Sequence, residues 1–136
     1  MGLKEKLSIK AFQENKYGQL VNEISAIAGF EPGWDIDWNS LAVEGQGSLY
    51  NEGFTKIYFQ PVKKAFSKIV KSELGKESLK ASLQTIVIRN QNDNYSPQSA
   101  YSFENGILTI DHSPVTNIDE VDDRTDYLTE MLYSKL

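Results

Sequence analysis

The chain has 136 residues, of which 40% are hydrophobic and 24% are charged, with a net charge of −5. This length and composition are typical of one folded domain and exclude an intrinsically disordered chain, while the acidic total argues against nucleic acid as the main partner. The absence of cysteine excludes disulfides, zinc–thiolate sites, iron–sulfur clusters and cysteine nucleophiles.

The first half of the chain is predicted to be mainly helical. Apolar residues at helical spacing predict a helix over residues 3–28, with a break at Gly18 as an alternative to one continuous helix. Strict alternation over residues 34–38 predicts a strand, with both tryptophans facing the core. An amphipathic helix is predicted from about residue 59 to 74, and Pro61 either starts it or kinks a longer helix. A short helix over residues 76–83 follows.

The second half is predicted to contain three strands and a helix. Residues 84–89 are the best strand by composition. Asn105-Gly106 predicts a tight hairpin turn, which pairs Phe103 with Leu108 and Tyr101 with Ile110 and puts all four on one buried face. An apolar stripe predicts a final helix over residues 118–134, with Asn117 and Glu120 at capping-box spacing.

These elements predict a single α+β domain over residues 1–136. We expect a mainly antiparallel sheet of about four strands with helices packed on one face, in the order α-β-α-α-β-β-β-α. No run approaches about 18 apolar residues, so we expect no membrane span. The first six residues lack the apolar core of a secretory signal, and we therefore expect a cytoplasmic protein.

The end of the chain resembles a group of small bacterial proteins of uncharacterised function. The similar residues are 104–106, 108–112 and 116–117, followed by Val121 and Arg124, with weaker similarity at 36–38 and 75–77. The resemblance covers about a third of the chain. It supports a hairpin followed by a helix and implies no activity.

The only histidine, His112, is the first catalytic candidate. The hairpin register puts it on the core face at the end of its strand. A lone histidine in such a place is commonly a structural hydrogen-bonding residue, and a catalytic role is the alternative. No serine or cysteine lies beside it in a nucleophile motif.

Three aspartates form the second candidate. Asp35 and Asp37 share one strand face about 7 Å apart, and Asp111 lies on the polar side of another strand. They could act as acid and base or bind a divalent cation, or they simply keep an exposed strand soluble. We predict no metal site. We also predict no cofactor, because the glycines around Gln46 are not followed by the Gly-Lys-Ser/Thr of a phosphate-binding loop.

Charge is segregated along the chain. Residues 31–53 hold five acids and no base, residues 54–80 hold seven lysines and two acids, and residues 111–136 hold seven acids and two bases. The lysines are interpreted as a solvated helix face, and binding of nucleic acid or of an acidic lipid is the alternative. The acids of the final helix are more numerous than its N-terminus needs. They either form a solvated face or dock a basic partner, and the predicted binding residues of that docking surface are Asp119, Glu120, Asp122, Asp123, Asp126 and Glu130.

Two functional hypotheses follow. The first is a small acidic binding protein, such as an immunity or antidote protein that inhibits a basic partner protein. The second is a small-ligand domain or small enzyme with Asp or His polar groups in an aromatic-lined pocket. Its candidate lining residues are Trp34, Trp38, Tyr50, Tyr58 and Phe59. The sequence leaves the oligomeric state open.

Overall fold

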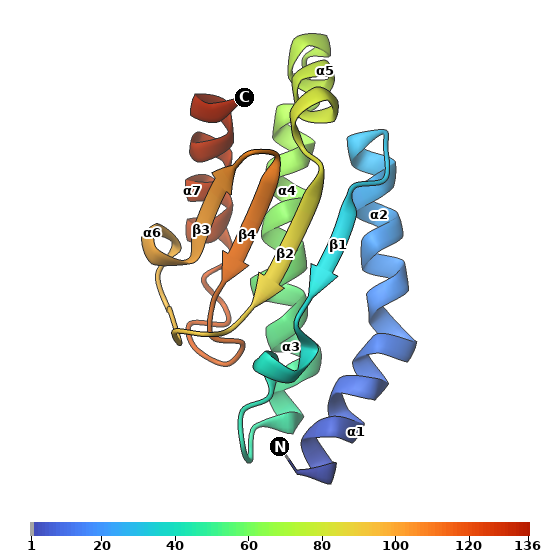
Figure 1. Ribbon diagram of the computed structural model, residues 1–136, viewed down its shortest axis with the longest axis vertical. Helices are drawn as coiled ribbons and strands as arrows, with labels where there is room; N and C mark the ends of the chain where they lie inside the picture. Colours follow the sequence, from blue (N-terminus) through green and yellow to red (C-terminus); the bar gives the residue numbers. More distant parts are fainter. Residues whose placement is uncertain (1) are drawn as a thin grey trace.

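The computed structural model describes residues 2–136, so Met1 of the expected domain lies outside the described residues. A four-stranded sheet lies against one layer of helices (Figure 1). The strands are β1 (Gly33–Ile36), β2 (Thr85–Arg89), β3 (Tyr101–Glu104) and β4 (Ile107–Asp111), arranged in the order β1-β2-β4-β3. The α+β class, the four strands and the helices on one face are therefore confirmed.

The strand directions differ from the expected mainly antiparallel sheet. β1 pairs with β2 and β2 pairs with β4 in parallel, while the β3–β4 hairpin is antiparallel. A long helical crossover connects β1 to β2 and returns the chain to the same end of the sheet. The expectation of a mainly antiparallel sheet is wrong because alternation within a strand reports its buried face and not its direction.

The N-terminal helix is continuous through Gly18. α1 (Leu3–Phe12) runs into a π-helical turn at residues 13–17 and then into α2 (Gly18–Ala28). α2 ends at Gly29, whose φ of +81° is the left-handed conformation of a helix C-cap. The helix is therefore not broken at Gly18, and its departure from α-helical geometry is the wider π-helical turn just before this residue.

The second long helical segment explains Pro61. α3 (Tyr50–Phe54), a π-helical turn at residues 55–59 and α4 (Gln60–Ile69) follow one another without a gap. Pro61 lies in the first turn of α4, directly after the π turn. Proline cannot donate to the preceding turn of a helix, and the π turn supplies the local departure from α geometry that it needs. α5 (Glu73–Ser82) then leads into β2.

The last helix starts later than predicted. A short α6 (Pro97–Ala100) precedes β3, and α7 spans Val121–Lys135. Asn117 has a φ of +55° and lies in a turn, and the side chain of Glu120 caps no amide of α7. The predicted capping box is therefore wrong, because the chain turns once more before the helix begins.

The hairpin confirms its predicted register. Asn105 and Gly106 have φ of +54° and +80°, as a two-residue hairpin turn requires. Phe103 pairs with Leu108 and Tyr101 with Ile110, and all four side chains are buried. Local turn chemistry therefore determined this part of the sheet.

The hydrophobic core lies between the inner face of the sheet and the helices α2, α4 and α7. Its central side chains are Ile24, Val62, Phe66, Ile86, Ile88, Leu108, Ile110, Leu128 and Leu132. Val121, Thr125, Leu128 and Leu132 of the predicted stripe on α7 are buried, so the helix faces the core as expected. Within residues 2–136, no helix is both long and apolar enough to cross a bilayer.

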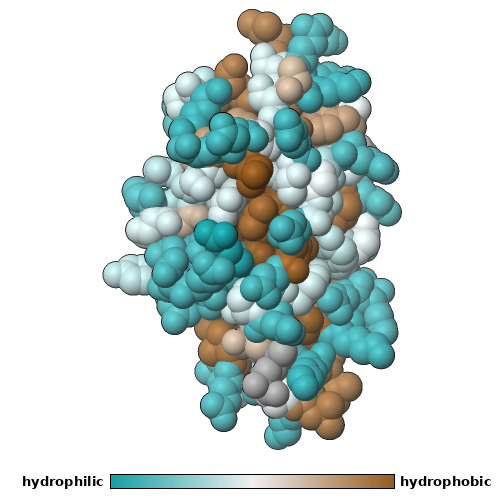
Figure 2. Space-filling model, in the orientation of Figure 1, coloured by the Kyte–Doolittle hydropathy of each residue, from teal (hydrophilic) through white to brown (hydrophobic). Residues whose placement is uncertain are grey.

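The opposite face of the sheet is uncovered. Val87 and Thr109 point outward from its centre and are partly exposed, and Ile107 is 40% exposed. Figure 2 shows a band of hydrophobic side chains down the middle of this face, with hydrophilic residues on both sides. Parallel strands usually have both faces covered, so a bare face on three parallel strands is an available surface.

Substitutions at two helical glycines, Gly53 in α3 and Gly18 in α2, test the packing of the helices. A Cβ at Gly53 would overlap the carbonyl oxygen of Pro114, whereas a Cβ at exposed Gly18 meets nothing within 4 Å. We expect Gly53→Ala to lower the free energy of unfolding by about 1–3 kcal/mol through overpacking. Gly18→Ala should raise it by about 0.5–1 kcal/mol, because alanine is the better helix former. Urea denaturation measures both, and equal effects of the two changes would contradict the close approach at Pro114.

Candidate functional site

The parallel strands place several polar segments at one end of the sheet. The carboxyl ends of β1, β2 and β4 lie together and are followed by Asp37, by the loop 90–96 and by His112. Figure 1 shows this end as the lower end of the sheet, above α3 and beside the start of α7. In open α/β sheets this edge is the usual place for a binding site.

Asp111 organises the loop that follows β2. Its buried carboxylate accepts hydrogen bonds from Arg89 Nε at 3.1 Å, from the Gln91 amide at 2.9 Å and from Asn92 Nδ2 at 3.2 Å. Three donors satisfy both oxygens, so the side chain has a structural role as the anchor of the loop. The sequence had placed Asp111 on a polar face, and the structure shows which polar groups cover it.

Further hydrogen bonds hold the rest of this loop. Asn94 Nδ2 donates to the Asp111 carbonyl at 2.9 Å, and the Asn94 carbonyl accepts from the Ser113 amide at 2.8 Å. Asn117 Nδ2 donates to the Tyr95 carbonyl at 2.9 Å. The loop therefore has a defined shape and presents the Tyr95 side chain, which is 65% exposed, toward solvent.

The tip of the loop carries an exposed carboxylate. Asn90 and Asp93 exchange two hydrogen bonds, from Asn90 Nδ2 to Asp93 Oδ1 at 3.0 Å and from the Asp93 amide to Asn90 Oδ1 at 3.1 Å. Asp93 has a φ of +50°, which aspartate tolerates when its side chain bonds locally. The sequence predicted a polar loop here but not that hydrogen bonds give the loop a defined shape, although its run of Asn, Asp, Ser and Pro is a turn signal.

His112 is fully buried. Its Nδ1 lies 2.5 Å from the Ser113 carbonyl, which can only accept, so Nδ1 carries a proton, and in the neutral ring the lone pair is then on Nε2. Burial lowers the pKa of His112 to about 4, and the nearby charge of Arg124 disfavours the protonated ring further. The main-chain oxygen of His112 accepts a hydrogen bond from the Tyr58 hydroxyl. The imidazole is thus a core residue, on the core face that the register predicted.

Arg124 is the other buried basic group near this end. Its Nη1 donates to the Asn117 carbonyl at 2.7 Å, and its Nη2 donates to the Ile118 carbonyl at 2.6 Å and the Lys56 carbonyl at 3.2 Å. Burial lowers the pKa of Arg124. The guanidinium joins the turn at residues 117–118 to the helical segment 50–69. This contact positions the start of α7 and the acids that it carries.

Asp35 and Asp37 are exposed on the open face and edge of β1. Asp37 accepts a weak hydrogen bond from the Ser40 amide at 3.3 Å and starts a short 3₁₀ turn. β2 lies between β1 and β4, so neither side chain shares a site with Asp111. Among residues 2–136, no three His, Asp or Glu side chains are arranged to hold a metal ion.

Half of the predicted binding acids pair with lysines of the neighbouring helical segment, residues 50–69. Asp119 binds Lys56 at 2.8 Å, Asp122 lies 3.6 Å from Lys64, and Asp126 lies 3.4 Å from Lys68. These contacts lower the pKa of Asp119 and raise the pKa of Lys56. The acidic and basic blocks of the sequence therefore meet within the molecule, although each pair is exposed and contributes little by itself.

The lysine face of the helical segment is correspondingly neutralised. Besides these three pairs, Lys63 binds Glu23 at 2.8 Å, and Lys56 also contacts Glu52. The sequence interpretation of a solvated lysine face is thus refined to a face of ion pairs.

The other three predicted acids, Glu120, Asp123 and Glu130, make no salt bridge within the described chain. Glu120 and Asp123 lie close enough to share a hydrogen bond, and this contact raises the pKa of Glu120. They line a surface cavity of about 320 Å³ together with Tyr95, Ser96, Pro97, Asn117 and Arg124. We call this set the Tyr95 site. It combines an exposed aromatic ring with two crowded carboxylates.

The aromatic residues of the ligand-pocket hypothesis pack against one another. Phe59 contacts the rings of Trp34 and Tyr17 at 5.7 and 5.9 Å between centroids, and Tyr50 stacks on Phe54 at 4.7 Å. Tyr50, Tyr58 and Phe59 are buried in the core. None of these side chains lines the cavities described here.

Comparison with protein-family models, with curated proteins and with solved structures finds no match to this chain. The features that point to a function are the geometry of the Tyr95 site and the surfaces around it.

Proposed function

We propose that the protein is a cytoplasmic binding protein of the immunity or antidote type, which inhibits a basic partner protein by docking it on the Tyr95 site. The observation that carries the proposal is that Glu120 and Asp123, which make no salt bridge within the described chain, line one surface cavity beside the exposed Tyr95. Two like charges in contact favour a cation between them, and Lys or Arg of a partner supplies one.

The rigidity of the loop supports the proposal. The hydrogen bonds to Asp111, Asn94 and Asn117 hold Tyr95 in place before binding, so little conformational entropy is lost when a partner docks. An exposed, pre-positioned tyrosine is a common anchor of protein interfaces. The bare face of the sheet begins at Arg89, next to this loop, and offers apolar area for the same partner.

The pairing of charges supports a protein partner over nucleic acid. Four of the lysines that could meet phosphates, Lys56, Lys63, Lys64 and Lys68, already contact acids of α2, of α7 or of the turn before α7. A small-ligand domain or enzyme that uses Asp35, Asp37 or His112 is the alternative function. The burial of the His112 ring and the separation of these residues favour the binding protein.

Neutralising the carboxylate pair should slow binding. We expect Glu120→Gln with Asp123→Asn to reduce the association rate of the partner about tenfold at low salt, since attraction between charges steers association. Tyr95→Ala should raise the dissociation rate about tenfold through loss of the anchor. Partners are first captured from the native host at low and high salt. The rates are then measured with the purified partner by surface plasmon resonance.

Matched controls lie at the other end of the molecule. Glu73→Gln with Glu77→Gln makes the same change of charge on the exposed start of α5, and Tyr133→Ala removes another exposed tyrosine. Neither control should change the rates. Capture of no basic protein, or rates that respond equally to the site variants and the controls, would contradict the proposal.

A further inference from the structure

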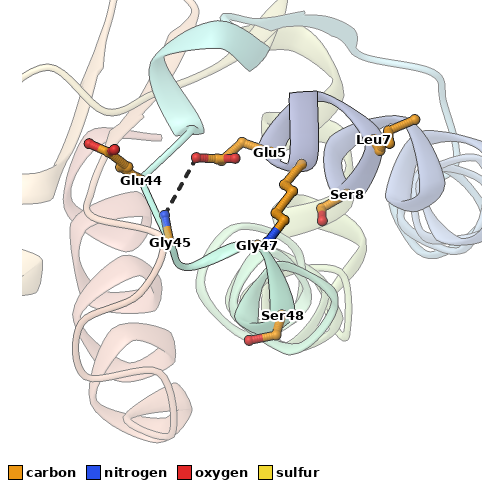
Figure 3. Close-up of a pocket in the computed structure, with 8 residues that line it drawn as sticks. Glu5, Leu7, Ser8, Glu44, Gly45, Gly47 and Ser48 are labelled. Carbon is orange, nitrogen blue, oxygen red and sulfur yellow. Dashed lines mark hydrogen bonds between the residues drawn. The ribbon is translucent and has the colours of Figure 1, made fainter. Parts of the chain in front are cut away.

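The largest cavity described lies away from the Tyr95 site, between α1 and the loop 43–48. Its volume is about 670 Å³, within the range of small-molecule sites. It is lined by Lys4, Glu5, Leu7, Ser8, Glu44, Gly45, Gly47 and Ser48. Figure 3 shows the Glu5 side chain reaching from α1 toward the loop, where a hydrogen bond from the Gly45 amide meets it.

Glu5 is an unusual lining residue because it is only 7% exposed. Its single hydrogen bond within residues 2–136 is the Gly45 contact, which is long at 3.4 Å and reaches Oε1. No lysine or arginine of the described chain forms a salt bridge with Glu5. The Gly45 bond uses Oε1, and Oε2 is not among the enclosed atoms that lack a partner, so Oε2 is accessible and has capacity for a ligand donor.

The wall opposite Glu5 is held in place. The buried Tyr50 hydroxyl accepts from the Val43 amide at 2.7 Å and donates to the Val43 carbonyl at 3.1 Å. Gly47 packs so closely on α1 that a Cβ there would lie 2.7 Å from Ser8 Oγ. The cavity therefore has a built wall on both sides and exists before any ligand binds.

A second cavity of about 360 Å³ adjoins the first around Glu5. It is lined by Gly2, Glu5, Asn39, Ala42 and Glu44. Glu5 and Glu44 thus line a shared polar space, with the Glu44 side chain directed away from Glu5 (Figure 3) and with Lys4 as the one basic residue among its lining residues. Carboxylates in such a space bind ammonium or guanidinium groups through charge-assisted hydrogen bonds. Among residues 2–136, no set of three acidic or histidine ligands favours a metal ion here.

We propose that this cavity, the Glu5 site, binds a small organic cation with an alkylammonium or guanidinium group. The cation donates to Glu5 Oε2 and occupies the space that Glu5 and Glu44 line. The inference goes beyond the proposed function and does not depend on the Tyr95 site. The cation comes either from a free small molecule or from a basic side chain of a bound protein, and both sources share this chemistry.

The test is a nuclear magnetic resonance titration of the full chain with N-acetyl-arginine amide and N-acetyl-lysine amide at constant ionic strength. At least one of them should produce saturable shifts of the Gly45, Gly47 and Ser48 amides, with a Kd on the order of 1 mM. The uncharged citrulline analogue should produce none. Absence of saturable shifts for both probes, or equal shifts with the citrulline analogue, would overturn the proposal.

Substitutions of the residues that line the cavity test which side chains contact the cation. Glu5→Gln keeps an acceptor for the Gly45 amide but removes the charge, and should weaken binding at least tenfold. Lys4→Gln should tighten binding about threefold, because it removes a repelling ammonium from the cavity. Glu14→Gln, an exposed change on the same long helix, should have no effect. Equal binding by Glu5→Gln and Glu14→Gln overturns the proposal, and if Glu5→Gln fails to fold, Lys4→Gln and Glu44→Gln decide it.

Competition separates the two sources of the cation. If N-acetyl-arginine amide displaces a protein partner, the site takes a basic side chain of that partner. If N-acetyl-arginine amide still shifts the amide signals of the site but does not displace the protein partner, the site takes a free small molecule. A failure of the Tyr95 proposal shows in the binding rates of the Tyr95 and Glu120 variants, whereas a failure of the Glu5 site shows in the amide shifts, so the two results are distinguishable.

Discussion

Arg124→Ala is expected to lower the free energy of unfolding by about 3–5 kcal/mol. The guanidinium is buried and donates to the carbonyl oxygens of Asn117, Ile118 and Lys56. Truncation leaves these acceptors without their donor and opens a cavity where a large side chain was packed. The measurement is equilibrium denaturation in urea, with the folded baseline checked by circular dichroism.

Two comparisons make the Arg124 prediction specific. Lys135→Ala removes an exposed partner of Glu104 and should change the stability by less than about 1 kcal/mol. Arg124→Lys keeps the positive charge but lacks the planar fork of donors, and should recover less than half of the loss. If Arg124→Ala is as stable as Lys135→Ala, the guanidinium does not hold the turn before α7.

The stability of the protein should fall steeply with acid because of His112. Its pKa is about 4 when folded and about 6.5 when unfolded, since burial disfavours the charged ring. Above pH 6.5 the ring is neutral in both states and no stability is lost. Below pH 6.5 the unfolded chain binds the proton first, so about 2 kcal/mol should be lost by pH 5 and about 3 kcal/mol below pH 4.

His112→Asn isolates this effect from the titration of carboxylates. Asparagine can keep a donor to the Ser113 carbonyl but does not titrate. The difference in unfolding free energy between the wild type and the variant should therefore shrink or reverse between pH 7 and pH 5. A difference that stays constant over this range would show that the ring is not buried in its neutral form.

The sequence predicted the local features of the fold well. The Asn105-Gly106 turn, the pairing of Phe103 with Leu108 and the apolar stripe of α7 are as expected. Each depends on residues within a few positions of one another, where turn chemistry and hydrophobic period are informative. The later start of α7 also has a local cause, which is the turn at Asn117.

The candidate sites were predicted less well. The sequence identified the acids in and just before α7 but not which of them are paired. The structure pairs three with lysines, Asp119, Asp122 and Asp126, and leaves three outside these salt bridges, Glu120, Asp123 and Glu130. Tyr95 and the Glu5 site were missed. Their significance depends on which side chains remain exposed or unpaired after packing, and a single sequence does not report this.

The sequence by itself determined the main helices and strands and which of their faces are buried, because the signals for both lie in neighbouring residues. It did not predict α6, and the strand predicted over residues 34–38 ends at Ile36, with Trp38 in a 3₁₀ turn. Only the tertiary structure decided the parallel direction of β1, β2 and β4, the ion pairs between α4 and α7, and the role of Asp111 as the anchor of the loop 90–96. These features join residues up to about 60 positions apart. Their energies depend on contacts that exist only once the helical crossover has returned the chain to the sheet.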